Sequence, residues 1–157
     1  MLNATPGILR SLTAGLTYQQ LTRKPEPDRF SIAEVFGHLA DAELRTYTPR
    51  IRALCAGGNP AFPAYTPPDS FEREPDAALS EFETLRDENV AFLANVPAEA
   101  LLNTGLHSRL GPMTLDNVLA EIAYHDLGHI KQVCELVRWL QFYPRMGPFQ
   151  QESSVNP

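Results

Sequence analysis

Two histidines, His125 and His129, have the residue type and the spacing that most directly suggest chemistry in this chain. They lie four positions apart, so a helix would place both imidazoles on one face, about one turn from each other. On a helical wheel they interrupt a narrow apolar sector, which contains Val118, Ile122, Leu136 and Leu140. A buried imidazole without a partner is costly. The pair is therefore interpreted either as metal ligands or as hydrogen-bonded core residues.

A third histidine, His38, lies far upstream at the margin of another helical apolar stripe. Taken alone it fits a structural or solvent-facing role, but with His125 and His129 it makes a set of three imidazoles from two helices. Neutral imidazole suits zinc, nickel, copper or ferrous iron, whereas calcium and magnesium prefer oxygen ligands. Three protein ligands also leave a coordination position open, as in catalytic sites. We expect a divalent transition metal, with zinc or nickel ahead of iron.

Three polar residues near the histidine pair are candidates for a catalytic or supporting role. Asp126 could orient a ligand imidazole or act as a base, although its place on the outer flank of the stripe favours a salt bridge. Glu121 could hold the second nitrogen of His125. Gln132 lies three positions beyond His129, where it could reach a metal-bound water or serve as an amide at the edge of the core.

Other polar residues have two interpretations each. Asp41 could hold the second nitrogen of the upstream histidine, whereas Glu34 is expected to be used in helix capping. Arg45 and Arg109 could bind a substrate carboxylate or lie solvated on the surface. His107 precedes the last helix in a loop, where it could overhang the site or be an ordinary loop residue.

Four helical segments must position these residues. The first is expected to begin at Thr5-Pro6, where a capping residue precedes a proline of the first turn, and to end before Pro25. The third is expected to be capped by Asp76 and to end at Pro97. Asn89 falls on its apolar stripe, where it is either a satisfied core amide or a pocket residue.

The second and fourth segments carry the histidines. The second begins at Ser31, with a glutamate three residues later that completes a capping box. It continues, with a kink near Pro49, to the stop at Gly57-Gly58. The fourth is capped by Thr114 and ends near Tyr143-Pro144, with the longest amphipathic stripe in the chain.

Prolines separate these segments. The chain has 14 prolines in 157 residues, and the stretch from Asn59 to Pro75 holds five of them among aromatic residues. This density excludes a helix and indicates a crossover packed on the surface, of the kind that can join two parallel helices. The segment between Leu101 and Pro112 is short enough for a turn or a small hairpin.

Composition restricts the class of protein. A chain of 157 residues suits a single domain, and its net charge of −6, without a run of basic residues, argues against nucleic-acid binding. Cys55 and Cys134 match no metal-binding spacing, so we expect ordinary, partly buried thiols ahead of a disulfide pair. Without a signal-peptide pattern or a long apolar run, the sequence predicts a cytoplasmic protein that does not enter a membrane.

Three stretches, taken in order, resemble the DinB-like superfamily of bacterial four-helix bundles. They are SIAEVFGHLADAE at residues 31–43, GPMTL at 111–115 and HDLGHIKQ at 125–132. The resemblance implies an all-α four-helix bundle over residues 1–144, in up-up-down-down order with the long crossover between helices two and three, and a tail at 145–157. It also implies a divalent metal on His38, His125 and His129, and often a homodimer.

Some relatives in this superfamily are S-transferases or isomerases that use low-molecular-weight thiols such as bacillithiol or mycothiol, and others are considered metal-dependent hydrolases. We therefore expect a metal-dependent enzyme for a small molecule, with thiol transfer ahead of hydrolysis and pocket walls from the first and third helices. A bundle that binds a metal or ligand without turnover, and a structural bundle with metal-free histidines, are the alternatives. A zincin protease is excluded, because no histidine follows His129.

Overall fold

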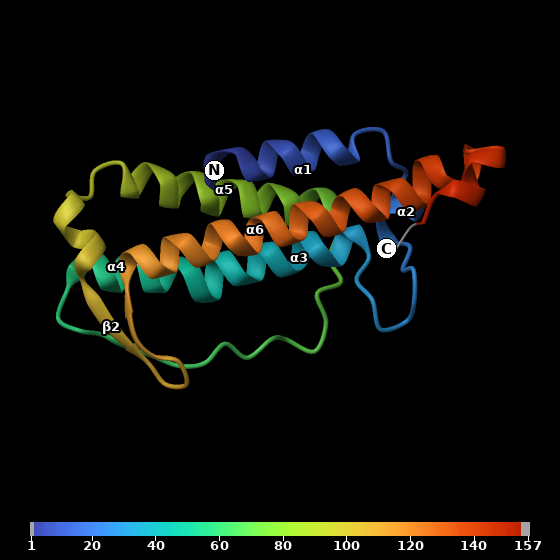
Figure 1. The fold of residues 1–157 in the computed structure, drawn as a ribbon. Coiled ribbons are helices and arrows are strands. Elements are labelled where there is room, and N and C mark those ends of the chain that lie inside the picture. The colour runs from blue at the N-terminus through green and yellow to red at the C-terminus, as the bar shows by residue number, and fades with distance from the viewer. Residues whose placement is uncertain (1, 155–157) are drawn as a thin grey trace.

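The computed structural model describes residues 2–154, whose helices form an elongated bundle with a long connection along one side (Figure 1). The fold is mostly helical, as predicted. The bundle consists of α1 (Thr5–Thr13), then a composite helix of α3 (Ile32–Ala42), the π-helical turn η2 (Glu43–Tyr47) and α4 (Thr48–Ala56), and then α5 (Pro75–Leu93) and α6 (Leu115–Val137). A small sheet at one end was predicted only as a turn or hairpin.

The first helix is shorter than predicted. The 3₁₀ turn Leu2–Ala4 leads into α1, so Ala4 occupies the capping position and Thr5 is the first helical residue. α1 ends at Thr13, and a separate short helix, α2 (Tyr18–Thr22), follows. Thr5 is fully buried, and its hydroxyl donates to a carboxylate of α6 instead of accepting from the N–H groups at the start of its own helix.

The capping box at the start of α3 is confirmed. The Ser31 hydroxyl accepts from the Glu34 N–H, and the Glu34 carboxylate accepts from the Ser31 N–H at 2.9 Å. Lys24 lies 2.6 Å from the same carboxylate. The kink predicted near Pro49 takes the form of the π-helical turn η2, which ends just before this proline enters the first turn of α4. A proline is tolerated there because its missing N–H has no intrahelical partner.

The composite helix and α5 run in the same direction. Glu43 contacts Arg86, and the later residue Thr48 contacts the later residue Asn89. α1 and α6 run the opposite way, as the colours of Figure 1 show. The order is therefore up-down-down-up, and the up-up-down-down order that we expected is wrong. The connection after α1 reverses the chain, so the composite helix runs antiparallel to α1. The crossover then returns the chain to the end of the bundle where the composite helix began, so α5 runs parallel to the composite helix.

The crossover follows one side of the bundle, as predicted, and includes the short strand β1 (Ala61–Phe62) (Figure 1). It approaches α3 closely at Gly37. A β-carbon at this position would lie 2.2 Å from the carbonyl oxygen of Phe71. Only glycine therefore allows this contact without a shift of the crossover.

The hairpin before α6 consists of β2 (Thr104–His107) and β3 (Gly111–Thr114), which are antiparallel. β1 pairs in parallel with β2, which gives a three-stranded sheet in the order β1-β2-β3. β3 leads directly into α6, which Thr114 caps as predicted. The cap of α5 is Glu74 and not Asp76, because Pro75 already occupies the first helical turn.

Two apolar clusters form the core, and a polar layer lies between them. One cluster gathers residues of α1, α3, α5 and the C-terminal half of α6, and the other gathers α4, the sheet and the N-terminal half of α6. On α6 the first cluster extends from Ile130 and the second ends at Ile122. His125 and His129 lie on α6 between these two clusters.

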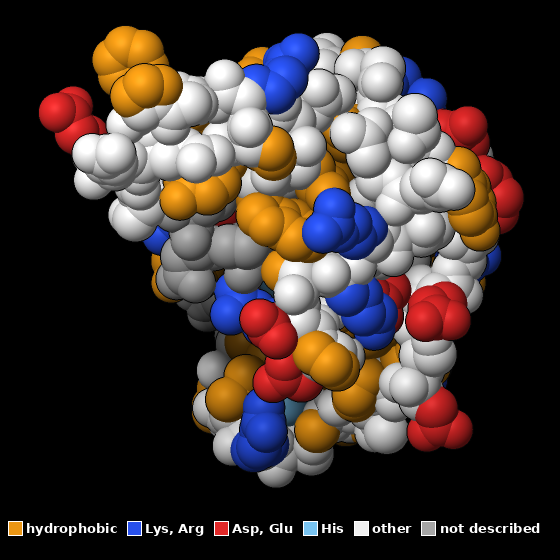
Figure 2. All heavy atoms as spheres, turned by 90° about the vertical axis from the view of Figure 1, so that its right-hand side faces the viewer, with side chains coloured by type: hydrophobic (Ala, Val, Ile, Leu, Met, Phe, Trp, Pro, Cys, Tyr) orange, Lys and Arg blue, Asp and Glu red, His pale blue; other side chains and the backbone are white. Residues whose placement is uncertain are grey.

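The C-terminal end continues as the π-helical turn Arg138–Phe142 and the 3₁₀ turns Tyr143–Arg145 and Gly147–Glu152. The end of the bundle seen in Figure 2 carries basic side chains among acidic and hydrophobic ones.

Within residues 2–154, no helix combines the length and the apolarity that crossing a bilayer requires. Cys55 and Cys134 are free, half-buried thiols, as expected.

Candidate metal centre

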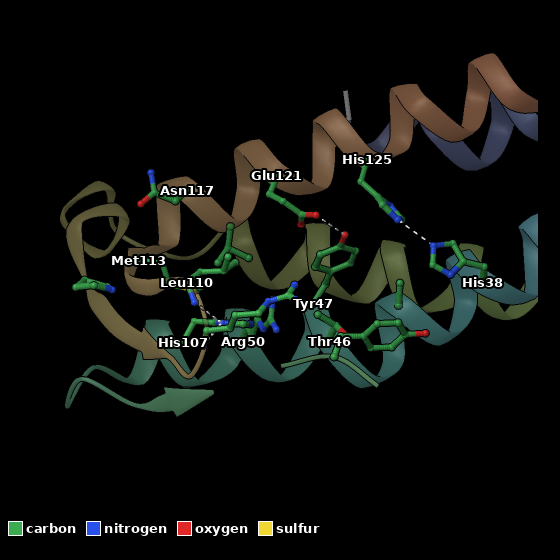
Figure 3. A pocket seen from close by; sticks show the side chains of 15 residues that line it. His38, Thr46, Tyr47, Arg50, His107, Leu110, Met113, Asn117, Glu121 and His125 are labelled. Atoms are coloured by element: carbon green, nitrogen blue, oxygen red, sulfur yellow. Dashed lines mark hydrogen bonds between the residues drawn. The ribbon is translucent and has the colours of Figure 1, made fainter. Parts of the chain in front are cut away.

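The three predicted histidines meet in the polar layer. Nε2 of His125 lies 3.0 Å from Nε2 of His38 and 3.1 Å from Nε2 of His129. His38 comes from α3, and the other two come from successive turns of α6, which runs antiparallel to it. All three side chains are half-buried and can offer ligand atoms within 4.8 Å of one another. The structure thus brings together the set that the sequence predicted from two distant helices, and Figure 3 shows two of its members, His38 and His125.

The nitrogen of His129 that faces the centre is fixed by Gln132. The amide oxygen Oε1 of Gln132 lies 2.9 Å from Nδ1 of His129. An amide oxygen only accepts, so Nδ1 carries the ring proton and Nε2 presents its lone pair to the other two histidines. Gln132 therefore orients one of the three candidate ligand histidines, and this contact differs from both of the roles that its position suggests.

The donor set fits a transition metal. One proton on Nε2 of His125 cannot serve both neighbouring nitrogens, whereas one cation can accept all three lone pairs. Two imidazole nitrogens on one tetrahedral zinc ion lie about 3.3 Å apart, given Zn–N distances of about 2.0–2.1 Å. The separations of 3.0 Å and 3.1 Å are close to this value. Three neutral imidazoles are therefore arranged so that they could hold one divalent metal ion.

The supporting contacts of the other two ligands differ from the prediction. Nδ1 of His38 and Nδ1 of His125 are buried and make no hydrogen bond to the residues that the structure describes. Asp41 does not reach His38, because it accepts from Tyr65 at 2.7 Å and from Arg45 at 3.3 Å. The ring of His38 is instead held by aromatic packing, with the ring centroids of Phe71 and Phe30 at 5.0 Å and 5.9 Å.

Burial keeps these imidazoles neutral. Desolvation, followed by the charges of neighbouring histidines, lowers the pKa of His38 to about 4 and that of His125 to about 3. Desolvation also lowers the pKa of His129, although the contact with Gln132 opposes the shift. A neutral imidazole is the form that binds a metal. The centre is therefore electrostatically ready for a cation at neutral pH.

A cavity of about 500 Å³ extends from His38 and His125 toward the hairpin. Figure 3 shows these two histidines at one end, Tyr47 and Glu121 along the middle, and His107 toward the other end. The composite helix, the crossover, the hairpin and α6 supply the wall, which consists of His38, Ala42, Thr46, Tyr47, Arg50, Tyr65, His107, Arg109, Leu110, Pro112, Met113, Asn117, Val118, Glu121 and His125. We expected the first and third helices to form the pocket walls, and this prediction is wrong. The corresponding helices, α1 and α5, contribute no residue to the cavity wall and lie on the other side of the histidines.

Glu121 lies on the cavity wall but does not hold His125. It accepts a hydrogen bond of 3.1 Å from the hydroxyl of Tyr47, whose ring meets that of His125 edge to face at 5.7 Å. Burial raises the pKa of Glu121, and the hydrogen bond from Tyr47 and the charge of Arg50 oppose this rise. The result is a carboxyl group with an elevated pKa on the same wall as two ligand histidines.

Asp126 points away from the cavity into a buried ionic network. Arg86 of α5 donates to Asp126 at 2.5 Å and to Glu43 at 3.0 Å, and Thr5 donates to Asp126 at 2.7 Å. The expected interhelical salt bridge is present, but the outer-flank position is wrong, since Asp126 is 0% exposed. Asn89 joins the network by donating to Glu43 at 2.8 Å, so it is a core amide.

Comparison with known proteins agrees with the sequence motifs. The family model of the DinB superfamily matches residues 1–133. The chain belongs to the DinB superfamily. No curated protein matches the chain. Among solved structures, this chain is similar in fold to YfiT from Bacillus subtilis, described as a probable metal-dependent hydrolase with an unusual four-helix bundle topology. The TM-score is 0.77 at 23% identity, over 88% of this chain and 82% of YfiT.

Two residues of the cavity wall, Tyr47 and Arg50, were not predicted from the sequence. Tyr47 belongs to the second apolar cluster and Arg50 is half-buried, and nothing in the sequence pattern separates such cavity residues from ordinary core or surface residues. The π-helical turn after Ala42 changes the helical phase and so alters which side chains face α6. Arg45, a candidate for substrate binding on sequence grounds, pairs with Asp41 outside the cavity, whereas Arg109 does line it.

Proposed function

We propose that this DinB protein is a metal-dependent enzyme that acts on a small molecule held in the cavity. The observation that supports this proposal is the convergence of three imidazoles at one end of a pocket of about 500 Å³, whose wall includes His38 and His125. A structural metal site has no need of such a space. Pockets of this size hold drug-sized molecules.

His38, His125 and His129 would hold the metal, with zinc or nickel ahead of iron. When bound, such an ion supplies a Lewis acid that makes a water molecule or a thiol nucleophilic at neutral pH. Glu121 would exchange the proton, because its raised pKa and its place on the cavity wall suit a general acid or base. Asp126 and Gln132 would act as positioning residues, because their oxygens are engaged by Arg86 and His129.

Thiol transfer remains our first candidate reaction. Neither Cys55 nor Cys134 lines the cavity, so a sulfur nucleophile would have to arrive as a low-molecular-weight thiol cosubstrate. Hydrolysis is the second candidate, and it is favoured by the description of YfiT as a probable metal-dependent hydrolase and by the carboxyl group of Glu121.

One assay separates the two reactions. Metal-loaded protein is incubated with a chromogenic electrophile, with and without low-molecular-weight thiols. A rate that requires the thiol and is lost in His125→Ala supports transfer, whereas a rate independent of thiol supports hydrolysis. Full metal occupancy without turnover over a broad substrate panel would contradict both and favour a binding bundle. Arg45→Ala is the matched control, because this exposed arginine pairs with Asp41 outside the cavity.

The family resemblance supports further proposals about the whole protein. We propose a bacterial, cytoplasmic homodimer in which residues 1–144 form the functional unit and 145–157 form a tail. The 3₁₀ turn Gly147–Glu152 belongs to this tail, and residues 155–157 lie outside the described part of the chain. Analytical ultracentrifugation of the chain with and without the tail tests the oligomeric state.

A further inference from the structure

The end of the cavity away from the metal centre is built by the hairpin and α4. His107 is the last residue of β2 and is only 4% exposed. Its Nδ1 accepts hydrogen bonds from the backbone N–H groups of Arg109 and Leu110, both at 3.1 Å. The ring proton of neutral His107 is therefore on Nε2, which makes no hydrogen bond to any residue between 2 and 154. The turn thus fixes His107 as a donor at the cavity wall.

Two arginines lie at the same end. Burial lowers the pKa of His107, and the charges of Arg50 and Arg109 lower it further, which indicates that both guanidinium groups are near the ring. Arg50 donates to the carbonyl oxygen of Pro63 at 3.4 Å. Neither arginine forms an ion pair with a side chain in the described part of the protein. This contrasts with Arg86 and Arg45, which are both paired with carboxylates.

The nearest acidic group on the cavity wall does not neutralise this end. Glu121 interacts electrostatically with Arg50, but its carboxylate receives the Tyr47 hydroxyl and lies beyond salt-bridge distance of the guanidinium. Figure 3 shows Glu121 and Tyr47 between the His107 end and the histidine end. The cavity therefore offers donors without acceptors at one end, a carboxyl group in the middle, and the metal centre at the other end.

We infer that Arg50, His107 and Arg109 form a subsite for an oxyanion, such as the carboxylate or phosphate group of the substrate. Two guanidinium groups and an imidazole N–H supply only donors, and guanidinium groups match the geometry of carboxylates and phosphates. Leu110, Met113 and Val118 supply apolar wall beside the subsite. This inference rests on the proposed function, and it names the substrate class: an anionic molecule with an apolar body, bound with its charged end remote from the metal.

The test uses a probe whose charged group is a poor metal ligand. Zinc-loaded, ¹⁵N-labelled protein is titrated with 1-hexanesulfonate and, separately, with hexyl methyl sulfone, which has the same chain and no charge. We expect the sulfonate to bind at least tenfold more tightly and to shift the amide resonances of Arg109 and Leu110. Equal affinities, or shifts confined to the neighbours of His125 and His129, would overturn the inference.

Three substitutions locate the effect. Arg50→Met and Arg109→Met should each weaken sulfonate binding about tenfold while leaving sulfone binding unchanged, and Arg45→Met should change neither. Unchanged sulfonate affinity in both Arg50→Met and Arg109→Met would contradict the subsite. Melting curves recorded for each variant verify that the fold is retained.

A metal-free arm separates this inference from the proposed function. In His129→Ala, zinc is lost if the metal centre is assigned correctly, but sulfonate binding should persist. Loss of sulfonate binding there would contradict the subsite, whereas wild-type protein that binds sulfonate but no metal would contradict only the proposed function. The same variant is titrated with hexanoate, hexyl phosphate and hexanol. The tighter of the two anions identifies the natural group, and anions that bind no better than hexanol would overturn the inference.

Discussion

Oε1 of Gln132 lies 2.9 Å from Nδ1 of His129, and this contact determines which nitrogen of the histidine faces the metal centre. His129 is the only one of the three candidate ligands whose second nitrogen has a hydrogen-bond partner among residues 2–154. His38 is fixed by the rings of Phe30 and Phe71. The centre thus combines one ligand oriented by an amide with two oriented mainly by packing.

Replacement of Gln132 tests this orientation. We expect Gln132→Leu to lower zinc affinity about 10–100-fold, the range found when partners of ligand histidines are removed. Gln132→Glu retains an acceptor and should recover most of the affinity. Competition with a chromogenic chelator measures the dissociation constants. Gln19→Leu, an exposed position on α2, is the matched control, and an equal loss in both leucine variants would contradict the role of Gln132.

The three histidines themselves should control metal content. Elemental analysis of purified His38→Ala, His125→Ala and His129→Ala should show loss of the metal found in wild-type protein, because two remaining imidazoles bind a divalent ion much less tightly. His107→Ala removes a buried cavity histidine outside the ligand set and should retain the metal. If all three ligand variants keep the wild-type content, the assignment of the centre is wrong.

The metal-free protein should lose stability as the pH falls below about 6.5. The unfolded chain protonates its histidines near that value, whereas folded His38 and His125 stay neutral until about pH 4 and pH 3. Between these values the unfolded state binds more protons, so acid favours unfolding. Each histidine contributes up to about 1.4 kcal/mol per pH unit, and we expect the free energy of unfolding to fall by about 2–4 kcal/mol from pH 7 to pH 5.

Urea unfolding of chelator-treated protein at several pH values measures this slope. Carboxylates also titrate toward the acid end, so the informative quantity is the difference from His38→Ala, whose slope should be smaller by the contribution of one histidine. Identical slopes for wild-type and His38→Ala protein would contradict the lowered pKa of His38.

The sequence predicted the pair His125 and His129 because i, i+4 spacing is a local property of a helix, whereas adding His38, 87 residues upstream of His125, relied on its place at the margin of another apolar stripe and on the family resemblance. Ser31, Thr114 and the proline cluster marked the start of α3, the start of α6 and the crossover, and all three are present in the structure. The supporting contacts were harder to predict. Partners such as Gln132 depend on side-chain rotamers, and the burial of Asp126 depends on Arg86, which is 40 residues away in the sequence.

The pattern of apolar residues also could not predict the direction of each helix or the change of helical phase within the second one. The π-helical turn Glu43–Tyr47 changes the phase of the second helix, so that a wheel drawn from Ser31 mispredicts the residues beyond it. Tyr47 and Arg50 lie in that region. The order of helix directions depends on the end of the bundle to which each connecting segment leads. Composition and hydrophobic periodicity do not specify this.

Gly37 should be required where the crossover meets α3. Gly37→Ala would bring a β-carbon to 2.2 Å from the carbonyl oxygen of Phe71, so the crossover must shift. We expect a loss of about 1–3 kcal/mol in the free energy of unfolding, as for other overpacking substitutions. Metal affinity should fall as well, because Phe71 packs on the ring of His38. Denaturant unfolding and chelator competition measure the two effects.

Gly7→Ala is the matched control for this substitution. Gly7 is also helical, but a β-carbon added there would meet no atom within 4 Å, so alanine should stabilise α1 by up to about 1 kcal/mol. A Gly37→Ala protein as stable as Gly7→Ala would show that the crossover does not depend on this contact.

The buried network around Arg86 should be the most sensitive ionic feature of the fold. Burial lowers the pKa of Arg86, but hydrogen bonds to Asp126 and Glu43 raise it above the usual value, so the guanidinium stays charged. Arg86→Met would leave two buried carboxylates without their cation. We expect a loss of about 3–5 kcal/mol in the free energy of unfolding, as found when one partner of a buried ion pair is removed.

The exposed ion pair between Arg10 and Glu83 provides the comparison for Arg86→Met. Arg10→Met removes a pair whose side chains are 48% and 27% exposed, so its effect should be about 0–1 kcal/mol. Arg86→Met should also reduce zinc affinity, because Asp126 follows His125 on α6 and the network holds that turn against α5. Urea unfolding and elemental analysis of both variants test this coupling. Equal stability losses, or a destabilised Arg86→Met protein with wild-type metal affinity, would separate the network from the metal centre.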